Sequence, residues 1–345
     1  MNILVTGGAG FIGSNFILYF LKKHKEHTII NLDKLTYAGN LENLKSLKSS
    51  AYHFVKGDIN NREIVEHIFR EFNISHVINF AAESHVDRSI LNPQIFLKTN
   101  ILGTETLLSV AKSFWSNSKK NKFLQVSTDE VYGSLGKEGL FSEATPLSPH
   151  SPYSSSKASA DLIVQAYHDT YGLPVNITRC SNNYGPYQFP EKLIPLMIHH
   201  ALNHKKLPVY GDGRNVRDWL YVEDHCSAIE TVLMNGTNGE VYNVGGNNEK
   251  ENIEIVNIIL KELNQITGDK KINKNLITYV KDRLGHDRRY AIDSSKIQKE
   301  LGWKPKMTFS KGIVKTIKWY LKNQDWVNTV ISGDYRNFYQ KNYKK

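Results

Sequence analysis

The chain has little of the chemistry that builds metal centres or disulfide frameworks. Its 345 residues include only two cysteines, Cys180 and Cys226, no CxxC or HExxH motif, and thirteen histidines without metal-ligand spacing. We therefore expect no metal and no disulfide scaffold. No apolar run approaches the ~18 residues that a membrane span requires, and the amino terminus carries no basic-then-apolar leader. The sequence predicts a cytoplasmic protein without a membrane partner.

Internal repeats and low-complexity linkers are also missing. The formal net charge is +10, but the lysines are scattered over expected surface segments, as Lys270, Lys271 and Lys274 are. Nucleic-acid binding needs clustered basic and aromatic residues, so we expect no nucleic-acid partner. The 40% hydrophobic and 23% charged residues are ordinary for a globular protein. The length favours two lobes, or one large α/β domain with a smaller cap.

Strand-like and helix-like segments alternate along the first half of the chain. Ile3 to Thr6 is a short β-rich run, Gly7 to Gly13 a glycine-rich turn, and Phe11 to Leu21 an apolar pattern of helical period. Further strands are expected at residues 28–32, 53–55, 77–80, 123–127 and 175–179. This rhythm predicts an α/β fold with a Rossmann-type, doubly wound parallel sheet.

The alternation weakens after about Asn182, where proline, glycine and aromatic residues become frequent. We therefore expect a Rossmann domain over residues 1–181 and, mainly over residues 182–345, a smaller substrate-binding lobe. Some segments of this second part should return to the first domain. Because no flexible linker joins them, the lobes should pack tightly and hold a ligand in the cleft between them.

The glycine-rich turn carries a dinucleotide-binding pattern. Gly7, Gly10 and Gly13 lie between the first strand and the first helix, where the backbone must turn sharply and approach a pyrophosphate. Asp33 ends the second strand, so its carboxylate can bind the adenosine ribose hydroxyls and repel a 2′-phosphate. The pattern predicts bound NAD. Lys34, next to Asp33, is the one feature that favours NADP.

A tyrosine and a lysine are spaced one helical turn apart at the start of a predicted helix. Tyr153 and Lys157 share one face, so the ammonium can lie beside the phenol and favour the phenolate, a useful general base. Ser127 and Thr128 end a predicted strand upstream of this pair. With these motifs in this order, the sequence resembles the extended short-chain dehydrogenases over nearly its whole length.

Three strings narrow the resemblance. They are Ser-Thr-Asp-Glu-Val-Tyr-Gly from Ser127, Ala-Ala-Glu-Ser-His-Val-Asp-Arg-Ser from Ala81, and Tyr-Ser-Ser-Ser-Lys-Ala-Ser from Tyr153. Together they resemble the signatures of the dTDP-glucose 4,6-dehydratases, which are hydro-lyases with tightly bound NAD. Ser127 to Glu130 also fits a helix capping box, but the residues that follow show no helical period.

The resemblance implies a role for each residue of this region. Tyr153, helped by Thr128 and Lys157, would take the proton of the sugar C4 hydroxyl while hydride passes from C4 to NAD. Glu130 would then remove the C5 proton, while a protonated Asp129 donates to the departing C6 hydroxyl. The hydride returns to C6, so the product is dTDP-4-keto-6-deoxyglucose and the cofactor is not consumed. The division of acid and base between the two carboxyl groups rests on the resemblance alone.

The same resemblance implies two sets of ligands and a homodimer. The expected NAD contacts are Gly7, Gly10, Phe11, Ile12, Gly13, Asp33, Lys34, Leu35, Thr36, Asp58, Ile59, Ala81, Ala82, Thr99, Tyr153, Lys157 and Asn183. The expected sugar-nucleotide contacts are Ser84, Thr128, Asn182, Lys192, Leu193, Pro208, Tyr210, Arg217, Asn252, Arg283 and His286. The long helical patterns at residues 92–114 and 153–171 resemble the pair with which relatives build a four-helix dimer interface.

Three other functions remain open at this point. A UDP-glucose 4,6-dehydratase would differ only in its nucleotide, and thymine and uracil differ by one methyl group, which a base-stacking surface discriminates weakly. A nucleotide-sugar 4-epimerase would need Tyr153 and NAD but not the pair Asp129 and Glu130. A binding or regulatory protein on the same fold would not need an intact Thr128, Tyr153 and Lys157.

Overall fold

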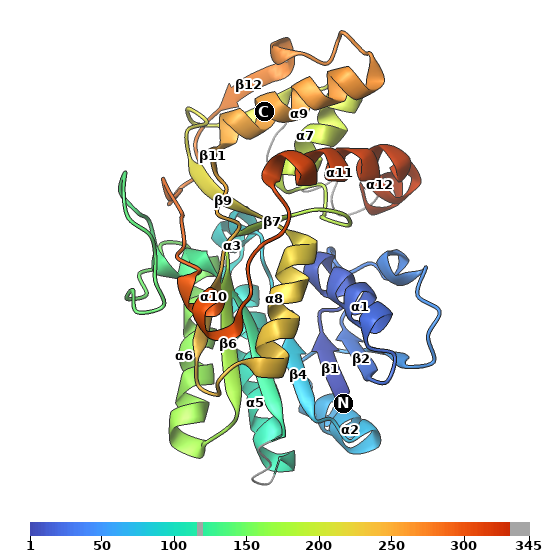
Figure 1. Ribbon diagram of the computed structural model, residues 1–345, viewed down its shortest axis with the longest axis vertical. Helices are drawn as coiled ribbons and strands as arrows, with labels where there is room; N and C mark the ends of the chain where they lie inside the picture. The colour runs from blue at the N-terminus through green and yellow to red at the C-terminus, as the bar shows by residue number, and fades with distance from the viewer. Residues whose placement is uncertain (116–119, 332–345) are drawn as a thin grey trace.

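A seven-stranded parallel sheet forms the centre of the computed structural model, which describes residues 1–115 and 120–331 (Figure 1). The strand order is β10-β6-β5-β4-β1-β2-β3, and every neighbouring pair is parallel. The strands are β1 (Asn2–Thr6), β2 (Thr28–Asp33), β3 (Tyr52–Lys56), β4 (His76–Asn79), β5 (Lys122–Thr128), β6 (Val175–Cys180) and β10 (Val241–Val244). The predicted doubly wound Rossmann-type fold is confirmed.

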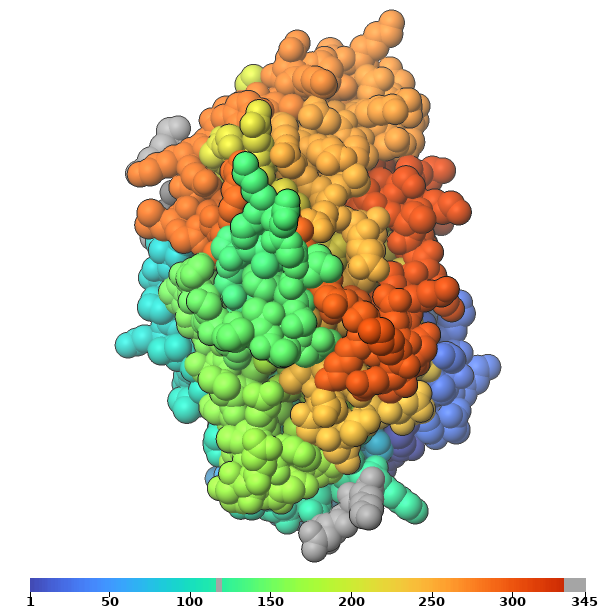
Figure 2. Space-filling model, turned by 60° about the vertical axis from the view of Figure 1, so that its left-hand side comes forward, coloured from blue at the N-terminus to red at the C-terminus, as the bar shows by residue number. Residues whose placement is uncertain are grey.

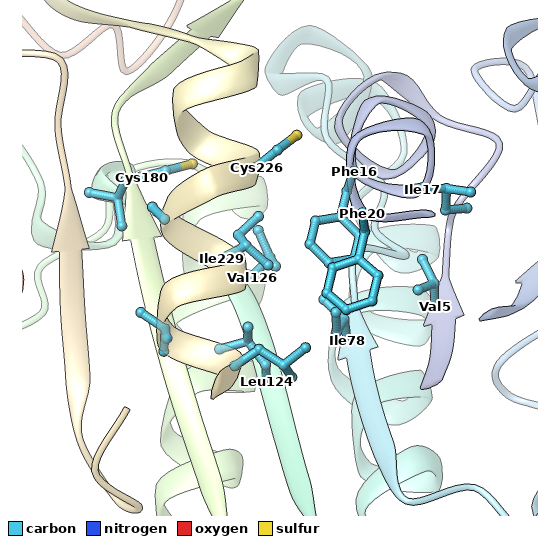
Figure 3. Packing of buried hydrophobic residues seen from close by; sticks show 14 of the residues in the cluster. Val5, Phe16, Ile17, Phe20, Ile78, Leu124, Val126, Cys180, Cys226 and Ile229 are labelled. Carbon is cyan, nitrogen blue, oxygen red and sulfur yellow. The ribbon is translucent and has the colours of Figure 1, made fainter. Parts of the chain in front are cut away.

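Helices cover both faces of this sheet (Figure 1). One face carries α1 (Phe11–Lys23), α8 (Val222–Asn235) and α10 (Ser295–Leu301), and the other carries α2 (Arg62–Phe72), α5 (Gly103–Phe114) and α6 (Pro152–Tyr171). Under α1, the rings of Phe16 and Phe20 lie in the same buried cluster as Ile229 of α8 (Figure 3). The apolar strand residues between them fill the space, so the sheet is a buried platform for its carboxyl-terminal edge.

The start of α6 is determined by strong local signals. Ser151 and Ser154 form a capping box, each side chain accepting from the backbone N–H of the other, and Pro152 occupies the first helical position. The helix ends at Gly172, whose φ of 68° suits a left-handed cap. These signals place Tyr153 in the first turn of α6.

The helix expected over residues 92–114 is a run of three segments. It consists of α4 (Pro93–Phe96), a π-helical turn η2 (Leu97–Leu102) and α5, and it follows α3 (Val86–Leu91). The π turn holds Asn100, whose buried side chain accepts from the Glu83 N–H at 2.9 Å and donates to the Ser156 hydroxyl at 2.8 Å. The irregular turn therefore ties α6 to the segment that follows β4.

The second lobe has its own sheets and core. β7 (Asn182–Tyr184), β9 (Val216–Tyr221) and β11 (Glu249–Glu251) form one sheet, and β8 (Leu207–Tyr210) pairs with β12 (Ile277–Val280). Its helices are α7 (Leu193–Leu202), α9 (Asn252–Thr267), the 3₁₀ turn η4 (Lys274–Leu276), α11 (Phe309–Lys322) and α12 (Gln324–Ile331). None of the helices that the structure describes is long and apolar enough to cross a membrane.

The two halves of the chain interleave. β10, α8 and α10 come from the second half but belong to the first domain. The loop after residue 133 also pairs with the chain near residue 290, since Leu135 N–H donates to Arg289 O and Phe141 N–H to Ala291 O. Figure 2 shows these green and orange-red segments side by side on one face. Residues 332–345 of the expected second lobe lie outside the described residues.

Candidate active site

Two cavities meet near the carboxyl ends of the central strands. The first has a volume of about 310 Å³ and is lined by the glycine-rich turn, the end of β2 and the start of α6. The second, of about 160 Å³, is lined mainly by the second lobe. Glu130, Asn182, Glu191 and Lys192 line both cavities. A ligand in one cavity therefore borders on a ligand in the other, and Glu130 lies at the junction.

The glycine-rich turn leaves no room for side chains on its inner side. A Cβ added at Gly7, where φ is +67°, would lie 2.7 Å from the Ala81 backbone nitrogen, and one added at Gly13 would lie 2.5 Å from Gly7 O. No side chain caps the amino terminus of α1 and its first turn has no acidic residue. The free N–H groups and positive end of the helix at this cavity fit a pyrophosphate.

Asp33 lies in the same cavity with its carboxylate fixed by two backbone groups. Its Oδ2 accepts from Ala9 N–H at 2.9 Å and its Oδ1 from Leu35 N–H at 2.8 Å. Burial raises the pKa of Asp33, while these two hydrogen bonds lower it. Lys34 is paired with Asp58 at 2.7 Å, so the lysine that favoured NADP is partly neutralised by a neighbouring carboxylate. The residues present fit NAD.

The carboxylate pair follows β5 directly. Asp129 begins a 3₁₀ turn, η3 (Asp129–Tyr132), and the Thr128 hydroxyl accepts from Glu130 N–H at 3.3 Å and donates to Asp129 Oδ1 at 3.3 Å. The capping box considered for Ser127 is therefore wrong, because Thr128 is the capping residue, and one helical turn does follow it. Gly133, with φ of +87°, ends the turn. This short turn carries the two carboxyl groups.

The environments of the two carboxyl groups differ. Asp129 is 1% exposed, and its Oδ2 has no hydrogen-bond partner among the described residues. Burial, followed by the charge of Glu130, raises the pKa of Asp129 well above its usual value. Burial also raises the pKa of Glu130, but the cations of Lys192, Arg217 and Arg283 oppose that rise. Asp129 is therefore the group that holds a proton more readily.

Tyr153 and Lys157 both line the first cavity, as their spacing predicts. The Lys157 ammonium donates to the Val126 carbonyl of β5 at 2.8 Å, and burial lowers its pKa. Burial, then the charge of Glu130, raises the pKa of Tyr153 well above 10, while a hydrogen bond with the Thr128 side chain lowers it. These shifts favour the neutral phenol of Tyr153, and the Lys157 ammonium, which donates to Val126 O, is not among the groups that lower its pKa.

The second cavity is rich in cations that other groups hold in place. The buried guanidinium of Arg217 lies 4.2 Å from the Tyr290 ring centre and donates to Asp287 O at 2.9 Å. Arg283 forms an ion pair with Asp87 at 2.6 Å. Such fixed guanidinium groups suit a diphosphate.

The structure brings the predicted site residues together. Every residue expected to bind the sugar nucleotide lines one of the two cavities, and every expected NAD contact except Leu35 lines the first. Leu35 instead has a left-handed backbone, with φ of 55°, and orients Asp33 through its N–H.

A cluster around the buried Glu191, which lines both cavities, was missed by sequence reasoning. Glu191 accepts a hydrogen bond from Tyr37 at 3.0 Å and lies 3.5 Å from the guanidinium of Arg88, which stacks on the Tyr37 ring at 3.6 Å. These residues are far apart in the sequence. The signals that could have drawn attention to them are the position of Glu191 beside Lys192 and that of Arg88 in the string from Ala81. The cluster joins the segment after β2 to the second lobe.

One group of metal-type ligands lies outside the cavities within residues 1–115 and 120–331. The ligand atoms of His24, Glu26 and His27 lie within 4.8 Å of one another after α1. His24 also pairs with Glu230, and His27 with the amino-terminal nitrogen. The absence of a metal centre stays a prediction.

The site defines an enzyme of the extended short-chain dehydrogenase class. It combines a dinucleotide-binding parallel sheet, a Thr-Tyr-Lys set at the carboxyl edge of this sheet and an adjoining cationic cavity. The model of the family described as GDP-mannose 4,6 dehydratase matches residues 4–316. The chain belongs to this family of nucleotide-sugar dehydratases, as the three sequence strings indicated.

Individual relatives and solved structures indicate the same family. The dTDP-glucose 4,6-dehydratase of Xanthomonas campestris pv. campestris (strain B100) is 56% identical over 96% of this chain and 97% of the relative. The crystal structure of that enzyme from Bacillus anthracis str. Ames, in complex with NAD, is 56% identical, covers 96% of this chain and 99% of its own, and has a TM-score of 0.87. The Streptomyces venezuelae enzyme, with NAD and dTDP bound, is 45% identical, covers 96% and 100%, and has a TM-score of 0.89.

Proposed function

We propose that this chain is an NAD-dependent dTDP-glucose 4,6-dehydratase, a hydro-lyase that makes dTDP-4-keto-6-deoxyglucose. The observation that carries the proposal is the position of Asp129 and Glu130, two carboxyl groups with different pKa shifts at the junction of a dinucleotide cavity and a cationic cavity. A 4-epimerase has no use for such a pair. The relatives that are identical to this chain at more than half of the aligned residues have the same activity.

The first cavity holds NAD through the glycine-rich turn, the amino terminus of α1 and Asp33. When bound, NAD accepts a hydride from C4 of the sugar and returns it to C6. Tyr153 and Thr128 hold the C4 hydroxyl, and the ionised Tyr153 takes its proton. To do so Tyr153 must first lose its own proton, and Thr128 is the described group whose hydrogen bond lowers its pKa.

Glu130 removes the C5 proton after C4 has become a ketone, because three cations keep it the more acidic of the pair. Asp129 holds the proton that the departing C6 hydroxyl needs, since burial keeps it neutral. Arg217, Arg283 and Lys192 bind the diphosphate, and Tyr210 beside Pro208 offers a flat surface to the base.

Mass spectrometry of the reaction products tests the proposed function. Purified protein, with no cofactor added, is incubated separately with dTDP-glucose and UDP-glucose. We expect loss of one water from dTDP-glucose, and faster than from UDP-glucose. Faster loss from UDP-glucose would change the nucleotide that we propose. An unchanged mass with a resolved epimer would make the chain an epimerase, and no reaction after addition of NAD would contradict an enzymatic role on these sugars.

The pH dependence of kcat should be bell-shaped. Glu130 must be ionised, so activity falls as the pH drops through its raised pKa, and Asp129 must be protonated, so activity falls as the pH rises through its higher pKa. Asp129→Asn cannot donate this proton, so kcat should fall, and in the residual activity the alkaline limb should disappear while the acid limb stays. A profile of Asp129→Asn with the alkaline limb in place would assign that limb to another group.

A homodimer is part of the proposal. α3, the α4–η2 run and α6 expose Leu91, Ile95, Leu97, Leu102 and Leu162, with exposed fractions between 39% and 60%. Large apolar side chains gathered on neighbouring helices mark a surface that another chain covers. The cytosolic location expected from the sequence stays a prediction.

A further inference from the structure

The last described helix, α12, reaches back to the cofactor end of the first domain. The indole nitrogen of Trp326 donates a hydrogen bond to Asn43 Oδ1 at 2.8 Å. Asn43 lies in the 3₁₀ turn η1 (Leu41–Leu44) after β2 and is 2% exposed. The contact therefore joins two segments that are 283 residues apart in the sequence.

Asn43 passes this contact on to the glycine-rich turn. Its Nδ2 donates to Ala9 O at 2.9 Å, and the Asn40 N–H donates to the same oxygen at 3.0 Å. Ala9 N–H in turn donates to Asp33 Oδ2 at 2.9 Å. Trp326, Asn43, Ala9 and Asp33 are thus connected by consecutive hydrogen bonds, and the last two belong to the turn and the carboxylate that fit NAD.

The same tryptophan also packs against Tyr187, which directly precedes two residues that line the first cavity. Trp326 meets the ring of Tyr187 edge-on at 5.9 Å, and Trp319 of α11 meets it at 4.8 Å. The next two residues, Gln188 and Phe189, line the first cavity. α12 therefore contacts Asn43, which is hydrogen-bonded to the glycine-rich turn, and Tyr187, which precedes two residues that line the cavity.

We propose that Trp326 is a positioning residue that slows the release of NAD. By donating to Asn43 Oδ1, the Trp326 indole keeps the Asn43 side chain in the orientation that donates to Ala9 O. This bond keeps the glycine-rich turn and Asp33 in the conformation that fits the dinucleotide. The inference rests on the proposed function, in which the cofactor is regenerated in each cycle and has no reason to leave. It assigns to α12, the last described helix of the substrate lobe, a role in cofactor retention.

The test is the rate at which radiolabelled NAD leaves the full-length protein during a chase with unlabelled NAD, with no sugar nucleotide present. Trp326→Phe keeps an aromatic ring but loses the N–H donor, and leaves the buried Asn43 oxygen without this partner. We expect release faster by on the order of tenfold, since a lost hydrogen bond with a buried partner has about this effect on an equilibrium constant. At saturating NAD, kcat should stay at the wild-type value.

Trp319→Phe is the matched control, because Trp319 contacts Trp326 and Tyr187 but donates no hydrogen bond to Asn43 in the structure. It should release NAD at the wild-type rate. Asn43→Ala also loses the bond to Ala9 O, so it should release NAD at least as fast as Trp326→Phe, and the double variant no faster than Asn43→Ala. Wild-type release by Trp326→Phe, or equal acceleration in Trp319→Phe, would overturn the inference and leave the proposed function standing. A wild-type protein that binds no NAD would overturn the proposed function itself.

Discussion

Glu130→Gln oxidises C4 of the sugar but does not release water. The substitution keeps the size of the side chain at the junction of the two cavities, but it removes the base that takes the C5 proton. General-base catalysis typically contributes about 10²- to 10⁴-fold, so the dehydration rate should fall by at least about 10²-fold. Oxidation at C4 does not use this carboxylate, so reduced cofactor should accumulate.

Stopped-flow absorbance of the reduced nicotinamide, together with product mass spectrometry, checks this expectation. Glu138→Gln is the control, because Glu138 is exposed in the loop after η3 and should behave like the wild type. Full dehydration by Glu130→Gln would show that another group is the base. A fall in dehydration without accumulation of reduced cofactor would place Glu130 in the oxidation step.

Tyr153→Phe stops the reaction one step earlier. The ring that packs edge-on against Phe96, at 6.3 Å between centres, is kept, but the phenol that handles the C4 hydroxyl proton is lost. We expect kcat to fall by about 10²- to 10⁴-fold, with neither dehydrated product nor reduced cofactor. The absence of reduced cofactor distinguishes this variant from Glu130→Gln.

Tyr171→Phe gives the matched control at the other end of α6. Tyr171 is 51% exposed and lies far along the helix from the site, so its hydroxyl should not matter for turnover. NAD content, measured on the denatured protein, should be equal in both variants. Rapid formation of reduced cofactor in Tyr153→Phe would mean that a group other than Tyr153 accepts the C4 proton.

The sequence predicts the central strands well because they are buried on both faces. All seven residues of β5 are buried, the apolar Phe123, Leu124 and Val126 among them, and its predicted end at residue 127 lies one residue from the observed end. The glycine-rich turn and Asp33 were found for a different reason. Close backbone approach demands glycine at particular positions, and this leaves a clear pattern in the sequence.

Other features could not be predicted because they depend on long-range contacts. β10 has only four residues, and nothing local shows that it pairs with β6 rather than with the second lobe. The cluster of Tyr37, Arg88 and Glu191 was missed for the same reason, because its residues are far apart in the sequence. The proton affinities of Asp129 and Tyr153 follow from their burial, which their positions in the chain do not reveal.

The place of β10 in the sheet has a consequence for synthesis of the protein on the ribosome. When residues 1–181 have emerged, β6 is an uncovered edge strand, because its partner Val241–Val244 has not been made. The apolar face that α8 will cover, with Leu124 and Val126 of β5, is exposed at the same stage. The nascent nucleotide-binding half therefore presents an open strand edge and an apolar surface until residue 244 has emerged from the ribosome.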